Sequence, residues 1–465
     1  MILAQIITTN LTASSTYTVT SSADDDFIFV ADGVLVSNTS PSSPAYSAVG
    51  VFHVGVRLDV AGTLMAGASP TVYSVAVDTT VSVTQTGAVI SLDSQSVWPT
   101  LYFAAGGARV FNDGQITGLY GAIFSTPQDA EVFNTGLISG NTFGVNGAVL
   151  VENLGTIRGV TAVSMSGGGD RLINLGYMVG NIILGSGDDL FDTIGGIVSG
   201  TVAGGAGEDV YRTDSAVLSI IELSGEGVGD RVESTVDFDL ATATEVENLT
   251  LLGNAKTGAG NGSGNMLIGN FRDNVLGGGV GDDTLNGGTG NDSLRGDIGL
   301  DQLLGGDGDD SLRGGASADR LYGGNDDDTV WGGIFGDRLY GENGEDQLVG
   351  GAGRDSLYGG ADADIFVFRA AADSGVGSGV RDVIFDCEAG LDLIDLSRMD
   401  ANTVLNGNQA FSFIATGAFT NVAGQLRAVH GTNSYIQADV NGDGVADFEV
   451  QLNAIATVSG NILLL

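Results

Sequence analysis

The sequence predicts an all-β protein in which an N-terminal parallel β-helix is followed by a parallel β-roll and a C-terminal β module. Three observations support this prediction. Ten aspartates recur at every ninth residue from Asp283 to Asp364, and a looser repeat of 19 to 22 residues runs through residues 58–210. Glycine is abundant and proline is rare, with 76 and 5 residues in a chain of 465. Short, regular periods of this kind are typical of solenoids, whose repeats contact only their neighbours.

The repeats divide the chain into five segments. We expect N-terminal strands or a cap in residues 1–57, the β-helix in 58–215, a connector in 216–256, the β-roll in 257–367 and the C-terminal module in 368–465. The first segment is rich in Thr, Ser and Val, and its sequence says little more.

The β-helix repeat is marked by asparagine. The segments VFNDGQITG, VFNTGLISG, VENLGTIRG and LINLGYMVG align, and we expect a buried ladder of stacked amides made by Asn112, Asn134, Asn153 and Asn174. Asp170, Asp189 and Asp209 recur in phase with this repeat, at 19 and 20 residues. They should stack on one edge of the helix, where they would either hold calcium or form a solvated acidic edge.

Each nonamer of the β-roll combines a turn with a strand. Its first six residues are rich in glycine, which tolerates the positive φ of tight turns, and they end in aspartate. The last three form a minimal strand whose single apolar residue, such as Leu303, points inward. Two nonamers make one coil of about 18 residues, so the aspartates form two columns. These are Asp283, Asp301, Asp319, Asp337 and Asp355 in one, and Asp292, Asp310, Asp328, Asp346 and Asp364 in the other.

The aspartate columns predict cation binding. Strands in a stack lie about 4.8 Å apart, so carboxylates in one column repel each other unless a cation lies between them. Hard oxygen ligands, without imidazole or thiolate, select calcium over transition metals. We therefore predict several Ca²⁺ ions, held by the ten aspartates and by the backbone carbonyls of Gly288, Gly290, Gly306, Gly308, Gly351 and Gly353.

Some repeats depart from the pattern. The fourth position, usually glycine, is occupied in four units by Ser317, Asp326, Phe335 and Asp362. Phe335 fits a tight turn worst, so calcium beside Asp337 is the most doubtful. Segments around Asn265 and Asp273 look like degenerate first repeats, and Asn265 lacks the charge that a metal site needs.

The nonamers, for example GGTGNDSLR and GGDGDDSLR, resemble the GGxGxDxUx repeats of RTX proteins. This resemblance implies that calcium is held between successive turns of the β-roll. From residue 364 onward the chain is similar to the C-terminal domain of serralysin-type secreted metalloproteases, in the stretches ADADIFVF, RDVIFDCEAGLDLIDLS, FSFIATGAFTNVAGQLRAV and DVNGDGVADFEVQL. The second resemblance implies a module that caps the roll and carries an uncleaved C-terminal signal, read by a type I ABC exporter.

One loop of the C-terminal module is a further metal candidate. Asp439, Asn441, Asp443 and Asp447 follow the spacing at the start of an EF-hand loop. Val450 stands where that loop needs a bidentate glutamate. We favour a turn here, and an additional calcium at Asp439 and Asp443 is the alternative.

The formal charge of −40 restricts the partners. Self-repulsion opposes compaction until cations bind, so calcium binding should be coupled to folding. Repulsion by phosphate argues against nucleic acid, and no apolar run reaches the length of about 18 residues that a membrane span needs. Calcium sites of extracellular modules, with Kd of about 10⁻⁴ to 10⁻³ M, stay empty in a cytosol. With the exporter signal, this predicts a secreted protein, extracellular or on the cell surface of a Gram-negative bacterium.

The sequence offers little for catalysis. It contains no zinc-protease HExxH motif, and its two histidines, His53 and His430, lie far apart. We expect an adhesion or cell-surface structural role, with surface glycans or other cell-surface components as partners. The alternative is a carbohydrate-active enzyme (a polysaccharide lyase, hydrolase or epimerase) with its site on the β-helix. Asp113, Asp129 and Glu131 leave open a hydrolase that works with paired carboxylates.

Overall fold

The computed structural model describes six short strands before residue 52 and residues 56–66, 71–74, 78–91, 99–126, 129–222, 225, 227, 229–453, 455, 458 and 460–465. Within these residues the chain forms β-strands and short 3-10 turns, with no α-helix, which confirms the predicted all-β class. Accordingly, this part of the chain has no helix of the length and apolarity that crossing a membrane requires. The chain forms two compact units, Met1–Glu233 (unit 1) and Ser234–Leu465 (unit 2).

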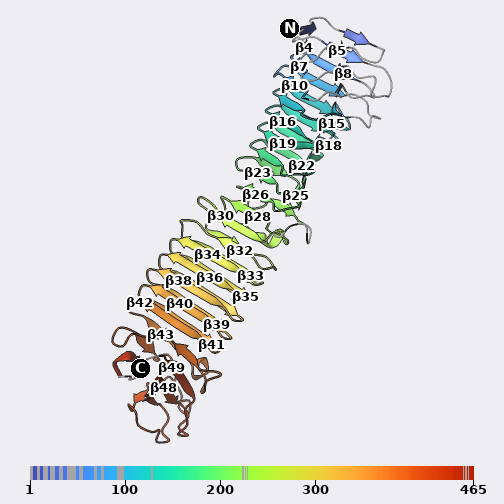
Figure 1. Ribbon diagram of the computed structural model, residues 1–465. Helices are drawn as coiled ribbons and strands as arrows, with labels where there is room; N and C mark the ends of the chain where they lie inside the picture. Colours follow the sequence, from blue (N-terminus) through green and yellow to red (C-terminus); the bar gives the residue numbers. More distant parts are fainter. Residues whose placement is uncertain are drawn as a thin grey trace. The chain divides into compact units, whose positions relative to one another are not determined.

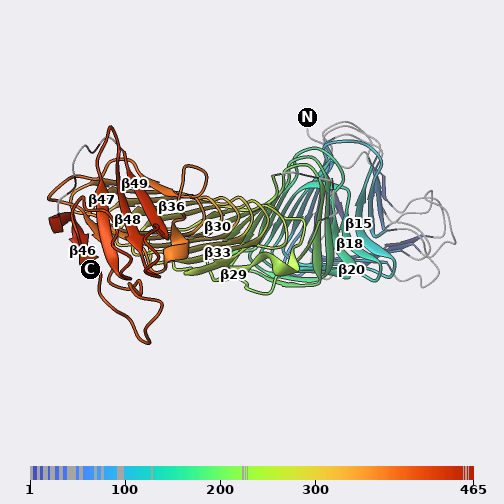
Figure 2. The same ribbon diagram turned by 90° about the horizontal axis from the view of Figure 1, so that it is seen from below.

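Unit 1 is a parallel β-helix with three faces (Figures 1 and 2). The first face contains β1 (Ala4–Ile7), β4 (Phe27–Val30), β7 (Arg57–Val60), β10 (Thr80–Val83), β13 (Arg109–Asn112), β16 (Ala130–Asn134), β19 (Ala148–Asn153), β21 (Arg171–Asn174), β23 (Leu190–Asp192) and β26 (Val210–Thr213). The second contains β2 (Leu11–Ala13), β5 (Leu35–Asn38), β8 (Thr63–Ala66), β11 (Ala88–Ser91), β14 (Gln115–Gly118), β17 (Leu137–Gly140) and β24 (Ile197–Ser199). The third contains β3 (Val19–Thr20), β6 (Val49–Val51), β9 (Val72–Ser74), β12 (Leu101–Phe103), β15 (Gly121–Ser125), β18 (Phe143–Asn146), β25 (Thr201–Ala206) and β27 (Ser219–Ile221). Two long strands, β20 (Thr156–Ser164) and β22 (Tyr177–Ser186), pair with the second and third faces at once.

The interior of unit 1 follows from the alternation of its strands. In β10, for example, Val81 and Val83 are buried and the residues between them face outward. The predicted asparagine ladder is confirmed: each side-chain amide donates to the carbonyl oxygen of the next asparagine, at 2.7, 2.7 and 2.8 Å along Asn112, Asn134, Asn153 and Asn174. All four are at most 1% exposed. The ladder therefore gives the buried amide in each of these four coils a hydrogen-bond partner.

Unit 2 begins as a parallel roll with two faces, whose strands are stacked coil upon coil (Figure 1). One face contains β30 (Asn248–Leu251), β32 (Met266–Ile268), β34 (Thr284–Thr289), β36 (Gln302–Asp307), β38 (Arg320–Asn325), β40 (Arg338–Asn343), β42 (Ser356–Ala361) and β44 (Asp382–Ile384). The other contains β29 (Phe238–Asp239), β31 (Thr257–Ala259), β33 (Val275–Val280), β35 (Ser293–Ile298), β37 (Ser311–Ala316), β39 (Thr329–Ile334), β41 (Gln347–Ala352), β43 (Ile365–Val367), β45 (Leu393–Asp395) and β50 (Leu463–Leu464). The strand β28 (Arg231–Ser234) spans the boundary between the units, and the 3-10 turns are η2 (Leu240–Thr242), η3 (Ala371–Asp373) and η4 (Gly460–Ile462).

The apolar core of the roll is formed mainly by the residue that stands two positions after each grid aspartate. The ten apolar residues that follow the grid aspartates are all at most 1% exposed, as predicted: Leu285, Leu294, Leu303, Leu312, Leu321, Val330, Leu339, Leu348, Leu357 and Phe366. The strands are longer than the three residues expected. Pairing of β36 with β38 continues through Gly306 and Gly324. Glycine permits this extension, because a Cβ on Gly324 would clash with the Gly306 carbonyl oxygen of the coil before it.

The chain closes with a small mixed sheet. The strands β46 (Ser412–Phe413), β47 (Gln425–Val429), β48 (Ser434–Asp439) and β49 (Phe448–Leu452) follow β45. β47, β48 and β49 are antiparallel neighbours, and β49 pairs in parallel with β44 of the roll. The last strand, β50, adds to the other face of the roll beside β45.

Candidate metal centre

Each grid aspartate stands one residue before a strand of the roll. Asp301, for example, precedes β36, and the buried Leu303 fixes its position against the core. The predicted columns form: within a column, the backbone N–H of one aspartate donates to Oδ1 of the aspartate one coil later. These bonds measure 2.6 to 3.0 Å in Asp283, Asp301, Asp319, Asp337 and Asp355 and in Asp292, Asp310, Asp328, Asp346 and Asp364. One carboxylate oxygen thus belongs to the backbone scaffold.

The second carboxylate oxygen, Oδ2, is buried and accepts no hydrogen bond in any of the ten grid aspartates. Their side chains are at most 3% exposed. Burial is the main cause that raises the pKa of these carboxyls, to about 7 for Asp283 and about 8 for Asp328 and Asp337. Charges of neighbouring aspartates in the column raise it further, as Asp346 does for Asp328. The folded roll therefore leaves a row of buried oxygens that need either a proton or a cation.

The first glycine of each nonamer shapes the space around Oδ2. A Cβ on Gly287 would clash with Oδ2 of Asp292, and it would lie 2.7 Å from the carbonyl oxygen of Gly305 in the next coil. The same arrangement recurs at Gly323, where the neighbours are Oδ2 of Asp328 and the carbonyl oxygen of Gly341. A carboxylate oxygen and a carbonyl oxygen thus lie side by side with no donor between them. This first position was not among the predicted site residues, although it is glycine in every complete nonamer.

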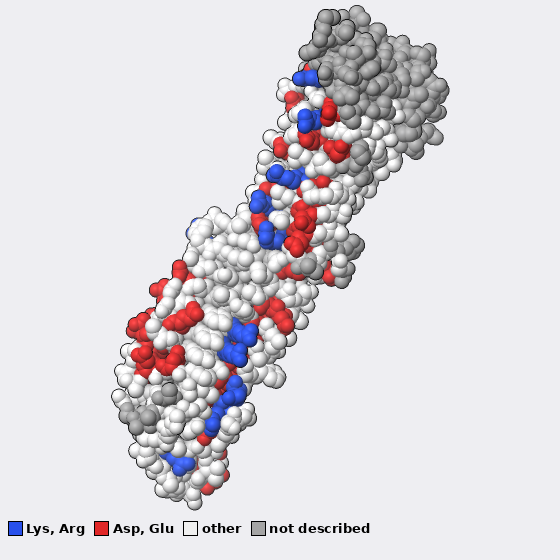
Figure 3. Space-filling view, viewed as in Figure 1, with Lys and Arg blue, Asp and Glu red and all other residues white. Residues whose placement is uncertain are grey.

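This donor set fits calcium. It consists of carboxylate and carbonyl oxygens, which hard divalent cations prefer, and it recurs between coils, where one cation can offset two charges. A groove of about 510 Å³ runs beside Asp283, Asp301 and Asp319. On the surface shown in Figure 3, acidic and basic side chains of unit 2 form separate groups, because the repeat stacks like on like, as with Arg320 and Arg338.

Of the glycines predicted to bind calcium through their carbonyl oxygens, Gly288, Gly306 and Gly351 lie in β34, β36 and β41, and Gly290, Gly308 and Gly353 come directly after the ends of these strands. Gly288, Gly290, Gly306, Gly308 and Gly351 have φ between 94° and 120°, whereas Gly353 does not adopt positive φ. The four substituted fourth positions also adopt positive φ: 95° at Ser317, 76° at Asp326, 75° at Phe335 and 79° at Asp362. The roll therefore imposes the glycine conformation on non-glycine residues. The role of these carbonyls as ligands stays a prediction.

The columns extend beyond the grid at both ends. The backbone N–H of Asp355 donates to Oδ1 of Asp382 at 2.8 Å, and that of Asp364 donates to Oδ1 of Asp392 at 3.0 Å, across insertions that lengthen the 18-residue coil to 27 and 28 residues. Upstream, Asn265 and Asn274 stand in the columns, so Asn274 rather than Asp273 aligns with the grid. A shorter pattern, an aspartate with an apolar residue two positions later, would have found Asp382 and Asp392. Ile384 and Ile394 stand at these positions, and both are buried.

Unit 1 has a column of the same construction. The predicted stacking of Asp170, Asp189 and Asp209 is confirmed, with N–H to Oδ1 bonds of 2.7 and 2.8 Å, and Asp230 continues the column at 2.8 Å. Oδ2 of Asp189 and Asp209 is buried and accepts no hydrogen bond, while Oδ2 of Asp170 accepts one from the Ser166 N–H at 3.2 Å. Burial raises the pKa of Asp170, Asp189 and Asp209 to about 6.

The loop at Asp439 and Asp443 uses its carboxylates differently. Asp439 accepts from Gly442 and Gly444 N–H groups at 2.6 and 2.9 Å, and Asp443 accepts from the Val445 N–H at 2.8 Å. Asp447 accepts from Val440 and Asn441. These bonds build a turn, and they give no separate support for calcium. Of the two histidines, His430 accepts a bond from the Val458 N–H at 3.1 Å, and His53 lies outside the described residues.

Comparison with known proteins identifies the repeats. The family described as RTX calcium-binding nonapeptide repeat (4 copies) matches residues 260–294, 268–303, 304–339, 331–366 and 340–374. The chain therefore carries RTX calcium-binding nonapeptide repeats in a β-solenoid. Among solved structures, the AlgE6R3 subunit from the Azotobacter vinelandii mannuronan C5-epimerase is 30% identical, covering 34% of this chain and 80% of that one, with a TM-score of 0.23. No curated protein matches the chain.

Proposed function

We propose that this chain is a secreted RTX protein that a type I system exports and that completes its folding on extracellular calcium. One observation supports this above all: the roll buries a row of carboxylate oxygens without any hydrogen-bond donor. Without a cation, each of these aspartates must stay protonated or repel its neighbours. With calcium, the free energy of ion binding becomes free energy of folding.

This coupling favours a location outside the cell. Extracellular calcium modules bind with Kd of about 10⁻⁴ to 10⁻³ M, far above the free calcium of a cytosol. The roll would then stay unfolded during synthesis and fold after export from a Gram-negative bacterium. The serralysin-like residues 368–465 would supply the signal for the type I ABC exporter.

We assign the calcium ligands of the roll to both columns. The ten grid aspartates would contribute Oδ2, and the first glycines, such as Gly305 and Gly341, would add carbonyl oxygens between coils. Gly288, Gly290, Gly306, Gly308, Gly351 and Gly353 stay candidates for further carbonyl ligands. The ions would supply the positive charge that the stacked carboxylates lack.

For unit 1 we propose an adhesion or cell-surface structural role. Its faces carry large apolar side chains in solvent, including Leu154, Leu175 and Tyr177, which are 57%, 52% and 56% exposed. The three acids considered as catalytic carboxylates of a hydrolase each interact with a neighbouring residue. Glu131 pairs with Arg109 at 2.9 Å, and Asp113 accepts from the Thr135 hydroxyl at 2.6 Å. Asp129 accepts from the Gly107 N–H at 2.8 Å.

Two measurements test the proposal. Far-UV circular dichroism and hydrodynamic radius of the purified chain should show a calcium-dependent gain of β-structure and compaction. Equal spectra and radii in excess chelator and in millimolar calcium would contradict it. In a host that carries a type I exporter, the full chain should reach the medium, and a variant lacking residues 460–465 should stay inside.

A glycan panel separates the adhesion role from the enzyme. Calcium-dependent binding to cells or glycans without turnover supports adhesion. Turnover that is lost when acids of residues 100–200 are replaced would favour a carbohydrate-active enzyme instead.

A further inference from the structure

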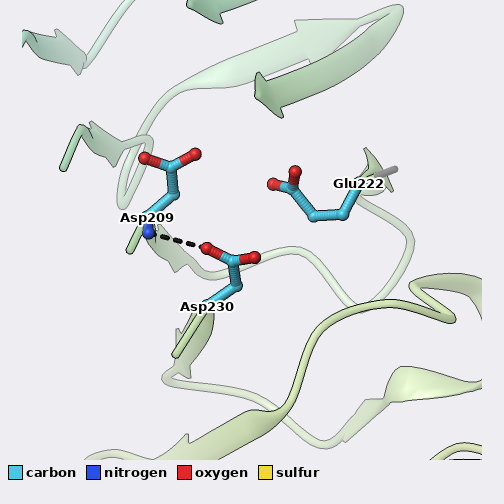
Figure 4. A group of neighbouring side chains, drawn as sticks. All are labelled: Asp209, Glu222 and Asp230. Carbon is cyan, nitrogen blue, oxygen red and sulfur yellow. Dashed lines mark hydrogen bonds between the residues drawn. The ribbon is translucent and has the colours of Figure 1, made fainter. Parts of the chain in front are cut away.

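Three carboxylates meet in the last coils of unit 1. Asp209 precedes β26, Glu222 follows β27 and Asp230 precedes β28, so they come from three successive segments of the chain. Each offers an oxygen within 4.8 Å of the others, and the side chains point toward one another (Figure 4). Asp209, Glu222 and Asp230 are 0%, 8% and 1% exposed. The group lies 30 residues before the first matched nonapeptide repeat, which begins at residue 260, and Glu222 belongs to no aspartate column.

Hydrogen bonds hold these carboxylates in place. Oδ1 of Asp209 accepts from the Asp189 N–H and Oδ1 of Asp230 from the Asp209 N–H, both at 2.8 Å. Glu222 accepts from the Gly205 N–H at 3.2 Å through Oε2 and from the Tyr211 hydroxyl through Oε1. These donors are backbone amides and a phenol, which are neutral. They orient the three acids.

One oxygen in the group indicates that the three carboxylates bind a ligand. Oδ2 of Asp209 is buried and accepts no hydrogen bond, and it faces the other two carboxylates. A Cβ on Gly204 would clash with this oxygen, with Oε1 of Glu222 and with the Tyr211 hydroxyl, so glycine keeps open the space where the three oxygens meet. Burial also raises the pKa of Asp209 to about 6. An unpartnered carboxylate oxygen inside the protein is costly unless a cation offsets it.

We propose that Asp209, Glu222 and Asp230 bind one calcium ion within unit 1, outside the nonapeptide repeats. The ligands are oxygens only, which excludes the imidazole and thiolate sets of transition metals. The carbonyl oxygen of Gly207 lies beside Oδ2 of Asp230, since a Cβ on Gly227 would clash with the first and lie 2.6 Å from the second. Calcium accepts such an irregular set of carboxylates and carbonyls, whereas magnesium demands a near-octahedral one.

The site would link the residue before β26, the residue after β27 and the residue before β28. The inference does not depend on export, because it concerns binding by the folded β-helix.

Calcium stoichiometry of the full chain gives the direct test. Glu222→Gln removes a proposed ligand charge at constant shape, and Glu208→Gln makes the same change at an exposed residue beside Asp209. After equilibrium dialysis against millimolar calcium, atomic spectrometry should find one calcium fewer per chain in Glu222→Gln than in Glu208→Gln. Equal numbers in the two variants would overturn the proposal.

Two further measurements test the proposal even if a variant misfolds. In hydrogen exchange followed by mass spectrometry, calcium should protect peptides of residues 201–222 in the parent and in Glu208→Gln but not in Glu222→Gln, with residues 129–186 unchanged in all three. For the parent protein, crystals grown with Tb³⁺ should show an anomalous peak between the three carboxylates. Peaks confined to the roll would overturn the proposal whatever the variants do.

Discussion

At the scale of the residue, the grid aspartate performs two tasks with two oxygens. Oδ1 accepts the N–H of the preceding coil, which any side chain with a suitably placed acceptor could do. Oδ2 has no partner and carries the charge that calls for a cation. Asparagine should therefore replace aspartate in the scaffold but not in the ion site. Asn265 and Asn274 already stand in the columns at the start of the roll, where their side-chain oxygens accept the N–H groups of Asn261 and Asn270 at 2.7 Å.

We predict that Asp328→Asn weakens calcium binding while the roll still folds. The amide retains the oxygen that accepts the Asp310 N–H, but the ion site loses one negative charge. The free energy of unfolding in calcium should therefore fall by about 1 to 3 kcal/mol. Calcium titration followed by circular dichroism measures the midpoint, which should move to higher calcium. Asp326→Asn is the matched control, since Asp326 is exposed two residues away. The same midpoint in both variants would contradict the division of tasks.

The first glycine should be as critical as the aspartate. We expect Gly323→Ala to destabilise the roll and to weaken calcium binding, because the methyl group would occupy the space between Oδ2 of Asp328 and the coil that follows. Gly277→Ala is the control, as nothing lies within 4 Å of a Cβ there. Calorimetric unfolding in calcium should separate the two variants by about 2 kcal/mol or more, as for overpacked interiors. If both unfold at the same temperature, the space around Oδ2 is not tightly shaped.

At the scale of the element, a buried polar ladder supports unit 1 without any ion. Asn153 accepts from Asn134 and donates to Asn174, so Asn153→Ala removes two buried side-chain hydrogen bonds. We predict that the free energy of unfolding of unit 1 falls by about 1 to 3 kcal/mol, and that this loss is the same with and without calcium. Asn141→Ala, at an exposed position, should cost little. A calcium-dependent loss in Asn153→Ala would show that the ladder is coupled to ion binding.

The sequence predicted elements best where the period is strict. The nine-residue grid placed ten aspartates and ten core residues, because each coil must repeat the geometry of the one below it. It did not include Asp382 and Asp392, where insertions lengthen the 18-residue coil to 27 and 28 residues, and the looser repeat of unit 1 did not include Asp230, 21 residues after Asp209. Glu222 was beyond sequence reasoning, since it reaches the Asp209 column from another face of the helix. Stacking fixes the position of each strand relative to the coil before it, whereas the length of the loop between strands can vary.

At the scale of the whole molecule, the excess of acid makes stability depend on what neutralises it. Burial raises the pKa of the column carboxyls in the folded state above the value of about 3.9 for an exposed aspartate. The folded state then binds more protons than the unfolded state, so stability falls as pH rises through the folded pKa values. In calcium-depleted buffer we predict the highest melting temperature near pH 4 to 5 and a steady decline up to about pH 8.

Calcium should reverse this trend, because it competes with protons for the same oxygens. The rise in melting temperature that saturating calcium causes should be largest near pH 8 and should shrink on acidification. Melting curves from pH 4.5 to 8.5, recorded with and without calcium, test both statements. A stability that increases with pH in the absence of calcium would mean that the carboxyls are ionised in the folded state without a cation.

The two units should respond to chelation differently, because their cores have different sources of stability. Unit 1 buries several apolar side chains per coil, including Val151 and Ile157, along with its amide ladder. The roll of unit 2 buries mainly the one apolar residue that follows each grid aspartate, which at about 1.5 to 3 kcal/mol for each side chain cannot also offset a row of buried charges. We predict that hydrogen exchange in chelator becomes fast across residues 257–367 while residues 129–186 stay protected. Restored calcium should recover the protection of the roll, and magnesium at the same concentration should not. Equal loss of protection in both segments would mean that the ion columns stabilise the whole chain rather than the roll.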